Sequence, residues 1–265
     1  KLDWDEYLSG VDCVIHTAAR VHIMKEYAAD PYQAFHKVNV AGTLNLAQQA
    51  RQHGVRRFIY LSSIGVNGNH NTDPFLETDK PNPKDPYAKT KLEAELKLFA
   101  LAKETGLQVV IIRPPLVYGY RAPGNFGSLL PWVNKGIPLP FGAVHNKRSF
   151  IALDNLVNFI LLCISHPKAA NAIFLIADGE DVSTTELLKK TAKAFGKALR
   201  LIPVPVSLMK FAASLIGKED LAIRLFGSLQ VDSTKARELL GWKPVITMDG
   251  QLQKIADAYR NETDV

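Results

Sequence analysis

Residues 57–61 read Arg-Phe-Ile-Tyr-Leu, a short and mainly apolar run that is typical of a buried β-strand. Similar runs stand on either side of it along the chain, at 11–16 and 107–112. A helical pattern of apolar residues separates each pair of runs, at 33–53 and again at 86–104. Strand–helix–strand alternation with strands of this kind predicts an α/β fold whose parallel sheet is covered by helices on both faces.

Local signals mark the ends of these two helices. Asp85 is a good N-cap residue, and Pro86 stands at the first helical position. Gly54 and Gly106 follow the two helical patterns and predict their C-terminal ends. We therefore expect residues 64–85 to form a loop.

The regular alternation stops at residue 119, and a stretch rich in Gly and Pro follows. Helix and strand patterns return at 154–165 and 172–177, and the last part of the chain reads as mostly helical. We expect one α/β domain over residues 1–119 and a smaller lobe over 120–265, from which a segment at about 150–177 returns to the first domain.

Composition excludes several classes of protein. The chain has 265 residues, 47% of them hydrophobic and 22% charged, which excludes a disordered, collagen-like or coiled-coil protein. The two cysteines, Cys13 and Cys163, form no C-x-x-C pair, so we expect no disulfide scaffold, no metal site and a reducing compartment, the cytoplasm. No apolar run approaches the length of a membrane span.

The net charge is +6, but the basic residues are scattered along the sequence. A solvated basic surface is the preferred interpretation, a site for an anionic small molecule comes next, and a nucleic-acid face comes last. We therefore expect neither a nucleic acid nor a membrane as a partner.

The second predicted helix begins with Tyr87-Ala88-Lys89-Thr90-Lys91. Positions i and i+4 share one face of a helix, so Tyr87 and Lys91 point to the same side. A cation beside a phenol stabilises the phenolate and lowers the phenol pKa, which makes a general base usable near neutral pH. Such a pair also arises by chance on a solvated helix, so its surroundings decide between the two interpretations.

Chemically distinctive residues follow all three predicted strands. His16–Ala19 follow the first, Ser62 and Ser63 the second, and Arg113–Pro115 the third. The carboxyl ends of parallel strands meet at one edge of a sheet, and ligands bind there in open α/β folds. This convergence favours the catalytic interpretation of Tyr87, whereas His16 itself is better explained as a packed histidine.

The residues resemble a known family, the extended short-chain dehydrogenases/reductases that act on nucleotide sugars. The likeness is strongest to 4-epimerases of the UDP-glucose type and to 4-keto-sugar reductases, and it covers nearly the whole chain. It rests on the order and spacing of HTAA (16–19), VNVAGT (38–43), YLSS (60–63), the Tyr87/Lys91 pair, RPPLVYG (113–119), LPFG (139–142), KRSFIALDNL (147–156) and LGWKP (240–244).

The resemblance implies a Rossmann-type, doubly wound parallel sheet in residues 1–119 and a substrate-binding lobe in the remainder. It implies that Tyr87, Lys91 and Ser63 are catalytic and that the cofactor is NAD, with NADP not excluded. The residues it implies at the cofactor are Thr17, Ala18, Ala19, Asn39, Leu61, Tyr87, Lys91 and Pro114. Those it implies at the nucleotide sugar are Ser63, Ser128, Leu129, Phe141 and Arg148, with Arg148 on the diphosphate. A homodimer is also implied, and helices 33–53 and 87–104 are the candidate contact surface.

Two features depart from the family pattern. No G-x-G-x-x-G occurs, and in the family this turn precedes the segment that matches His16 by about 60 residues, two βαβ units. We therefore expect the 265-residue chain to bind NAD poorly by itself. The second departure is Ile64-Gly65 after Ser63, where dehydratases of the family carry acidic residues, so a 4,6-dehydratase is disfavoured.

Three hypotheses remain open from the sequence. The first is NAD-dependent epimerisation at C4 of a UDP-sugar through a transient 4-keto sugar. The second is reduction of a nucleotide-linked 4-keto-6-deoxy sugar for surface polysaccharide by NAD(P)H. The third is a truncated, cofactor-free homologue that acts as a binding or structural subunit.

Overall fold

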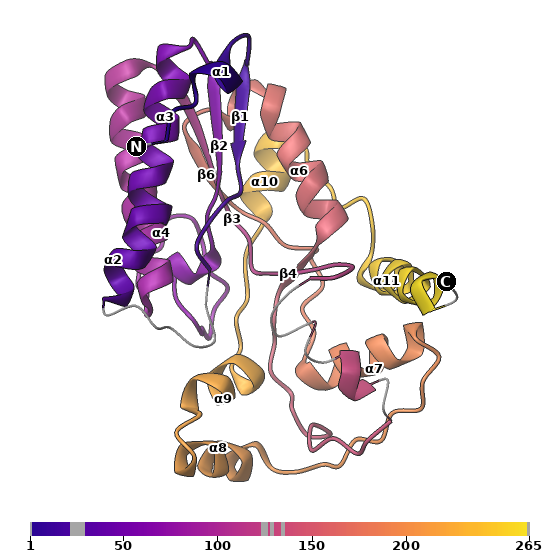
Figure 1. Cartoon of the computed structure of the whole chain (residues 1–265). Helices are drawn as coiled ribbons and strands as arrows, with labels where there is room; N and C mark the ends of the chain where they lie inside the picture. The colour runs from indigo at the N-terminus through magenta and orange to yellow at the C-terminus, as the bar shows by residue number, and fades with distance from the viewer. Residues whose placement is uncertain (1, 22–29, 123–126, 128–129, 134–135, 264–265) are drawn as a thin grey trace.

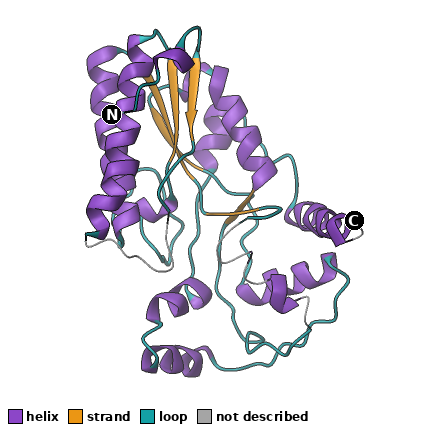
Figure 2. Ribbon diagram, viewed as in Figure 1, coloured by secondary structure: helices purple, strands orange, loops and turns teal. Residues whose placement is uncertain are grey.

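The chain folds around a four-stranded parallel sheet. The computed structural model describes all residues except 1, 22–29, 123–126, 128–129, 134–135 and 264–265. The sheet has the order β1 (Cys13–His16), β2 (Arg57–Leu61), β3 (Gln108–Arg113) and β6 (Ala172–Leu175), and every pairing is parallel (Figures 1 and 2). The predicted fold class is therefore confirmed.

Helices cover both faces of this sheet (Figure 1). Successive strand residues point to opposite sides, so each strand packs against both layers of helices. Phe58 and Ile111 pack with α3 (Thr43–Gln52) and α4 (Pro86–Thr105) on one face. Ile59 and Val110 pack on the other face, against α6 (Leu153–Ser165) and α10 (Thr234–Leu240). The sequence placed residues 234–240 in the second lobe, whereas α10 lies against the sheet.

The helix expected at 33–53 is longer and less regular than its pattern suggested. It begins as α2 (Pro31–His36), where the Asp30 side chain accepts a hydrogen bond from the Gln33 amide. It continues through a π-helical segment, η1 (Lys37–Gly42), into α3. Apolar periodicity does not distinguish a π turn from an α turn, and such turns are frequent at functional sites.

The ends of α4 agree with the sequence signals. The Asp85 side chain accepts a hydrogen bond from the Ala88 amide at 2.8 Å, which caps the helix in front of Tyr87. Gly106 ends the helix with φ +75°, a backbone conformation that favours glycine. The loop expected at 64–85 contains one short 3-10 turn, η2 (Ile64–Val66).

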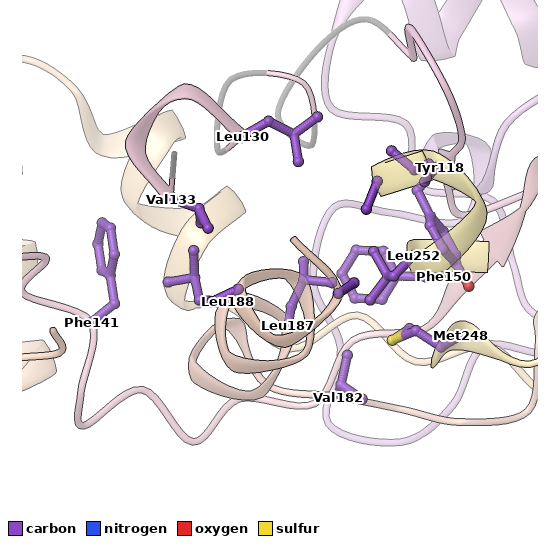
Figure 3. Packing of buried hydrophobic residues seen from close by; sticks show 14 of the residues in the cluster. Tyr118, Leu130, Val133, Phe141, Phe150, Val182, Leu187, Leu188, Met248 and Leu252 are labelled. Atoms are coloured by element: carbon purple, nitrogen blue, oxygen red, sulfur yellow. The ribbon is translucent and has the colours of Figure 1, made fainter. Parts of the chain in front are cut away.

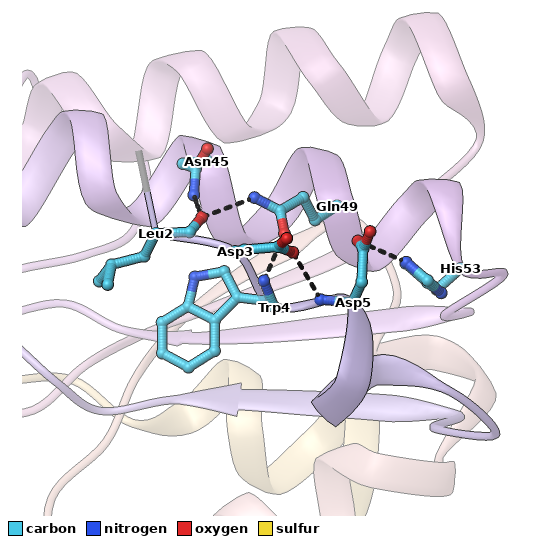
Figure 4. Close-up of polar contacts among 7 residues, drawn as sticks. All are labelled: Leu2, Asp3, Trp4, Asp5, Asn45, Gln49 and His53. Carbon is cyan, nitrogen blue, oxygen red and sulfur yellow. Dashed lines mark hydrogen bonds and ion pairs between the residues drawn. The ribbon is translucent and has the colours of Figure 1, made fainter.

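The segment before β1 is held on α3 (Figure 4). It contains the short helix α1 (Asp5–Leu8). The Leu2 carbonyl accepts hydrogen bonds from Asn45 Nδ2 at 2.7 Å and Gln49 Nε2 at 3.0 Å. His53 Nε2 lies 2.8 Å from Asp5 Oδ1.

The second lobe is built on a small parallel sheet of β4 (Leu116–Tyr118) and β5 (Phe150–Ala152). Phe150, Leu187 and Leu252 belong to its apolar core (Figure 3). After β5 the chain passes through α6, η3 (Pro167–Ala169) and β6 on the main sheet. The remaining helices of the lobe are α7 (Thr184–Ala194), α8 (Val206–Leu215), α9 (Glu219–Phe226) and α11 (Met248–Thr263).

Cys13 and Cys163 are both free thiols, and burial raises the pKa of Cys163 to about 12. Of the helices in the described part of the chain, none has the length and apolar character that a bilayer span requires. Among the same residues, no group of histidine, cysteine and carboxylate side chains is arranged to hold a metal ion.

Candidate active site

Tyr87 and Lys91 occupy the first turns of α4, beside the carboxyl end of β2. The Lys91 side chain is 1% exposed, and its Nζ donates a hydrogen bond to the Leu61 carbonyl at 2.8 Å. The same Nζ lies 4.4 Å from the centre of the Tyr60 ring and 5.8 Å from the centre of the Tyr87 ring. The predicted pair therefore does share one side of the helix, and the Leu61 carbonyl lies on that side.

The pKa values of this pair differ from the expectation. Burial raises the pKa of Tyr87 to about 12, and the Asp85 carboxylate adds to the rise. Burial lowers the pKa of Lys91 to about 8, against the opposing field of Glu95. The sequence predicted a lowered phenol pKa, whereas in the chain alone the pKa is raised, because burial disfavours the phenolate and the Asp85 carboxylate repels it.

Ser63 lies against the start of α4. Its Oγ accepts a hydrogen bond from the Gly65 amide at 3.1 Å. A Cβ atom at Gly65 would lie 3.3 Å from Ser63 Oγ and 3.4 Å from the Ala88 side chain, so this glycine separates the serine from the residue next to Tyr87. A side chain at position 65 would therefore press on both groups, and glycine leaves room for Ser63 beside the first turn of α4.

The loop after β1 is held in place by Asn39, which is buried in η1. Asn39 Oδ1 accepts from the Arg20 amide at 2.8 Å, and Nδ2 donates to the Arg20 carbonyl at 3.0 Å. Thr17 and Ala18 are exposed on this loop, and Ala19 is half-buried. The side chain of Asn39, which the resemblance implies at the dinucleotide, thus fixes the loop that carries residues 17–19.

Pro114 is buried at the end of β3, and its carbonyl accepts a hydrogen bond from the Ile64 amide at 3.0 Å. The third strand end is therefore joined to the segment that follows Ser63. The three strand ends and the N-terminus of α4 meet at one edge of the sheet, as the sequence predicted.

His16 is a packed residue of this edge. Its Nε2 lies 2.9 Å from Thr43 Oγ1, and its ring stacks on Tyr60 with centres 5.8 Å apart. The Thr43 hydroxyl donates to the Asn39 carbonyl at 2.8 Å, so it accepts from a protonated Nε2. Burial, with the charge of Lys91, lowers the pKa of His16 to about 4, and the ring is neutral near neutral pH.

A cavity of about 670 Å³ connects Tyr87 to the second lobe. Its lining includes Tyr87, Leu116, Gly119, Arg148 and Arg224. Burial lowers the pKa of Arg148 to about 10, and the nearby Arg224 cation contributes. Arg148 Nη1 donates to the Gly227 carbonyl at 2.9 Å, which fixes one side of its guanidinium. Sequence reasoning missed Arg224, because it lies in an ordinary amphipathic helix and in no motif.

The other substrate residues implied by the resemblance are not brought to this cavity. Phe141 is buried among aromatic side chains, with its ring centre 6.4 Å from Trp132 and 6.2 Å from Phe226. It lines a separate apolar cavity with residues of α8 and α9. Ser128 and Leu129 lie outside the described residues.

The donor set at the sheet edge fits the nicotinamide and ribose half of a dinucleotide. A buried ammonium, two hydroxyl groups and a loop of small residues stand beside the strand ends, as in open α/β sites for such ligands. The sequence has no G-x-G-x-x-G turn for the pyrophosphate, so the fit extends to this half alone.

Comparisons with known proteins agree with this geometry. The model of the NAD dependent epimerase/dehydratase family matches residues 1–177. A UDP-glucose 4-epimerase of Vibrio cholerae is 46% identical over 97% of this chain and 79% of its own length. A GDP-6-deoxy-D-mannose reductase of Pseudomonas aeruginosa is 26% identical over 94% of this chain and 81% of its own length.

Among solved structures, a UDP-glucuronic acid 4-epimerase from Bacillus cereus in complex with NAD superposes with a TM-score of 0.79. The superposition covers 98% of this chain and 78% of that chain at 22% sequence identity, so this likeness supports the fold alone. The family match spans about two thirds of the chain and includes every strand of the main sheet. The protein therefore belongs to the NAD dependent epimerase/dehydratase family.

Proposed function

We propose that this protein is an NAD-dependent epimerase that inverts C4 of a UDP-sugar. The observation that carries the proposal is the shared cavity, in which the Tyr87 side chain and two arginines line one space. A phenol that exchanges protons with a sugar hydroxyl and a pair of guanidinium groups for a diphosphate are the two parts that such a substrate requires. The 46% identical relative from Vibrio cholerae supports the choice of reaction.

The chain's own residues take distinct parts in the reaction. Tyr87 Oη accepts the proton of the C4 hydroxyl and later returns it, while Ser63 Oγ holds the same oxygen by a hydrogen bond. Lys91 holds the ribose hydroxyl groups, and Thr17, Ala18, Ala19, Leu61 and Pro114 surround the nicotinamide half. NAD bound there would supply the hydride acceptor and donor that C4 needs to pass through a transient 4-keto sugar.

Arg148 and Arg224 bind the diphosphate in this proposal. A guanidinium presents paired N–H donors that match two phosphate oxygens. The Gly227 carbonyl already orients Arg148, so little side-chain freedom is lost when the ligand binds. A fixed diphosphate lets the sugar turn over between the two hydride transfers.

Reduction of a nucleotide-linked 4-keto sugar, including one for surface polysaccharide, is the second candidate. The similarity to the Pseudomonas aeruginosa reductase favours it, and Tyr87 would then donate a proton. Reduction consumes one NAD(P)H for each sugar, whereas epimerisation is redox-neutral. The third candidate, a binding or structural subunit without cofactor, requires that neither reaction occurs.

The test is incubation of the protein and NAD with UDP-glucose that carries deuterium at C4. We expect UDP-galactose that retains the deuterium at C4, measured by NMR, with no net change in nicotinamide absorbance. Loss of deuterium to solvent would contradict hydride return. Stoichiometric consumption of NADH or NADPH with a 4-keto sugar, and no epimerisation, would establish the reductase instead.

We also propose that the protein is a cytoplasmic homodimer. Two free thiols fit a reducing compartment. Leu96 on α4 is 62% exposed, and Tyr32 on α2 stands on the neighbouring helix, where its hydroxyl donates to Glu93 Oε2 at 2.7 Å. These helices form one outer layer of the molecule (Figure 1) and provide a surface for a second copy.

A further inference from the structure

A buried polar cluster joins the two segments that carry the proposed catalytic residues to the end of β3, which carries Pro114. Its members are Ser62, Asn67, Glu95 and Arg113, and all four are buried. Ser62 precedes Ser63 at the end of β2, Glu95 lies one turn after Lys91 on α4, and Arg113 precedes Pro114 at the end of β3. The mechanism above does not use any of these four side chains.

Glu95 and Arg113 form the centre of the cluster. Glu95 Oε2 accepts from Arg113 Nη2 at 2.5 Å, and Glu95 Oε1 accepts from Arg113 Nε at 3.1 Å. The Ser62 hydroxyl also donates to Glu95 Oε1. Arg113 Nη1 donates to Asn67 Oδ1 at 2.9 Å, and Asn67 Nδ2 donates to the Leu76 carbonyl at 3.0 Å. A bidentate ion pair of this kind fixes the orientation of both side chains as well as the distance between them.

Stability alone does not explain a buried ion pair. Removing two charges from water is unfavourable, and apolar residues of similar volume often serve a folded protein equally well. The distinctive effect of this pair is geometric, because it fastens α4 to the ends of β2 and β3. Those are the elements whose relative placement sets the positions of Ser63 and Lys91.

Glu95 also acts on Lys91 by its charge. The groups that face Lys91 are the neutral His16 ring from β1, the Tyr60 ring and Leu61 carbonyl from β2, and Tyr87 and Glu95 on α4. Of these, Glu95 is the group whose field raises the pKa of Lys91 against the effect of burial. From β3, Arg113 is directed onto Glu95.

We propose that Glu95, oriented by Arg113, is a positioning residue of the catalytic centre. Through Ser62 it fixes the backbone that presents Ser63, and by its charge it keeps the buried Lys91 amine protonated. This inference rests on the proposed function for its kinetic part and on the chain's own electrostatics for the rest.

The test compares Glu95→Gln, the double variant Glu95→Gln/Arg113→Met and a control, Glu104→Gln. Glu104 is an exposed carboxylate near the other end of α4. Three properties are measured for each protein: the titration midpoint of Lys91, the kcat and KM for the UDP-sugar, and the unfolding temperature. The Lys91 midpoint is followed by NMR on protein whose lysines carry ¹³C at Cε. The Lys91 signal is assigned by its absence from the Lys91→Arg variant.

In both Glu95 variants we expect the Lys91 midpoint to fall by about half a pH unit or more. We expect kcat to fall by about 100-fold with a smaller change in KM, as misplacement of reacting groups predicts. The double variant should keep this loss even where its unfolding temperature returns to that of the wild type. Glu104→Gln should match the wild type in all three.

Two results would overturn the inference. One is an unchanged Lys91 midpoint in a folded Glu95 variant, and the other is a double variant that recovers kcat together with its unfolding temperature. Should Glu95→Gln fail to fold, the double variant still supplies both measurements. A wild type that does not turn over UDP-sugars would refute the proposed function and leave the midpoint comparison as the test of the electrostatic part.

Discussion

At the scale of single residues, burial disfavours the charged forms of Tyr87 and Lys91, the two proposed acid–base groups. Burial raises the pKa of the Tyr87 phenol to about 12 and lowers that of the Lys91 ammonium to about 8. A buried phenol therefore gives up its proton only as another charge or a hydrogen bond compensates, and in the proposed mechanism Ser63 and Lys91 are the groups that would do so. Catalytic groups in such surroundings reduce the stability of the fold. Replacing one of them by an apolar residue should therefore raise the free energy of unfolding, and this can be tested.

Replacing Lys91 by Met should stabilise the fold while it removes activity. The unfolded amine has a pKa of 10.5 and the folded one about 8. Near neutral pH the buried cation thus destabilises the fold by roughly 3 kcal/mol or less, at about 1.36 kcal/mol per pKa unit. The unfolded state binds more protons between these two values, so this penalty disappears as pH rises from 8 to 10.5.

Urea unfolding of the wild type and Lys91→Met checks this prediction. The free energy of unfolding of the variant should exceed that of the wild type by on the order of 1–3 kcal/mol near neutral pH. The difference should shrink as the solution approaches the pKa of free lysine. A variant that is less stable near neutral pH would mean that the hydrogen bond to Leu61 outweighs the burial of charge.

Replacing Arg148 by Met should weaken substrate binding far more than it slows chemistry. Hydrogen bonds to charged groups contribute about 1.5–3 kcal/mol, so we expect KM for the UDP-sugar to rise by about 10- to 100-fold. Steady-state kinetics and calorimetry with UDP measure the effect, and the unfolding temperature controls for the lost contact with Gly227. A loss confined to kcat would contradict a role in diphosphate binding.

At the scale of the element, the N-terminus of α4 couples helix capping to the acidity of Tyr87. Asp85 caps the helix through the Ala88 amide, and its negative charge raises the pKa of the phenol two residues later. Asparagine preserves the cap and removes the charge, whereas alanine removes both. The two substitutions therefore separate the effects.

Asp85→Asn should shift the pH dependence of kcat that reports Tyr87 ionisation to lower pH. The sign follows because loss of a neighbouring anion favours the phenolate. Asp85→Ala should show the same shift and a loss of about 1 kcal/mol of stability from the missing cap. pH–rate profiles and thermal unfolding of both variants measure this, and a shift to higher pH in Asp85→Asn would contradict the electrostatic role of Asp85.

At the scale of the whole molecule, we expect a homodimer formed through the layer of α2, α3 and α4. Light scattering during gel filtration should give about twice the 29.3 kDa mass of one chain. Leu96→Glu should give a monomer, because it replaces an exposed apolar side chain of this surface by a charge. The matched control is Leu215→Glu, an exposed leucine on α8, and a monomer produced by that variant alone would place the interface elsewhere.

Most of the main sheet could be predicted from the sequence, because its signals are local. The strand at 57–61 and the caps of α4 are encoded within a few residues of themselves, and the structure places them as expected. The π turn at 37–42 contacts α4, and the segment 234–240 packs on the main sheet, so both involve contacts between distant segments. No local pattern records such contacts.

The candidate site also contains residues that the sequence could predict and others that it could not. The sequence placed Tyr87, Lys91 and Ser63 at one edge of the sheet, because Ser63 follows a strand and the other two lie at the start of a helix. It could not identify Arg224, the direction of the Tyr87 pKa shift or the partnership of Glu95 with Arg113, because each depends on burial and on charges supplied by other elements.

The most direct test of the account is the turnover of Tyr87→Phe, which removes the one oxygen proposed to exchange protons with the sugar. With UDP-glucose and NAD, we expect its rate of epimerisation to fall at least about 100-fold, with unchanged circular dichroism and unfolding temperature. Tyr7→Phe, which alters an exposed tyrosine near the N-terminus, should retain the wild-type rate. A Tyr87→Phe protein that still interconverts the sugars at more than about a tenth of the wild-type rate would contradict the account.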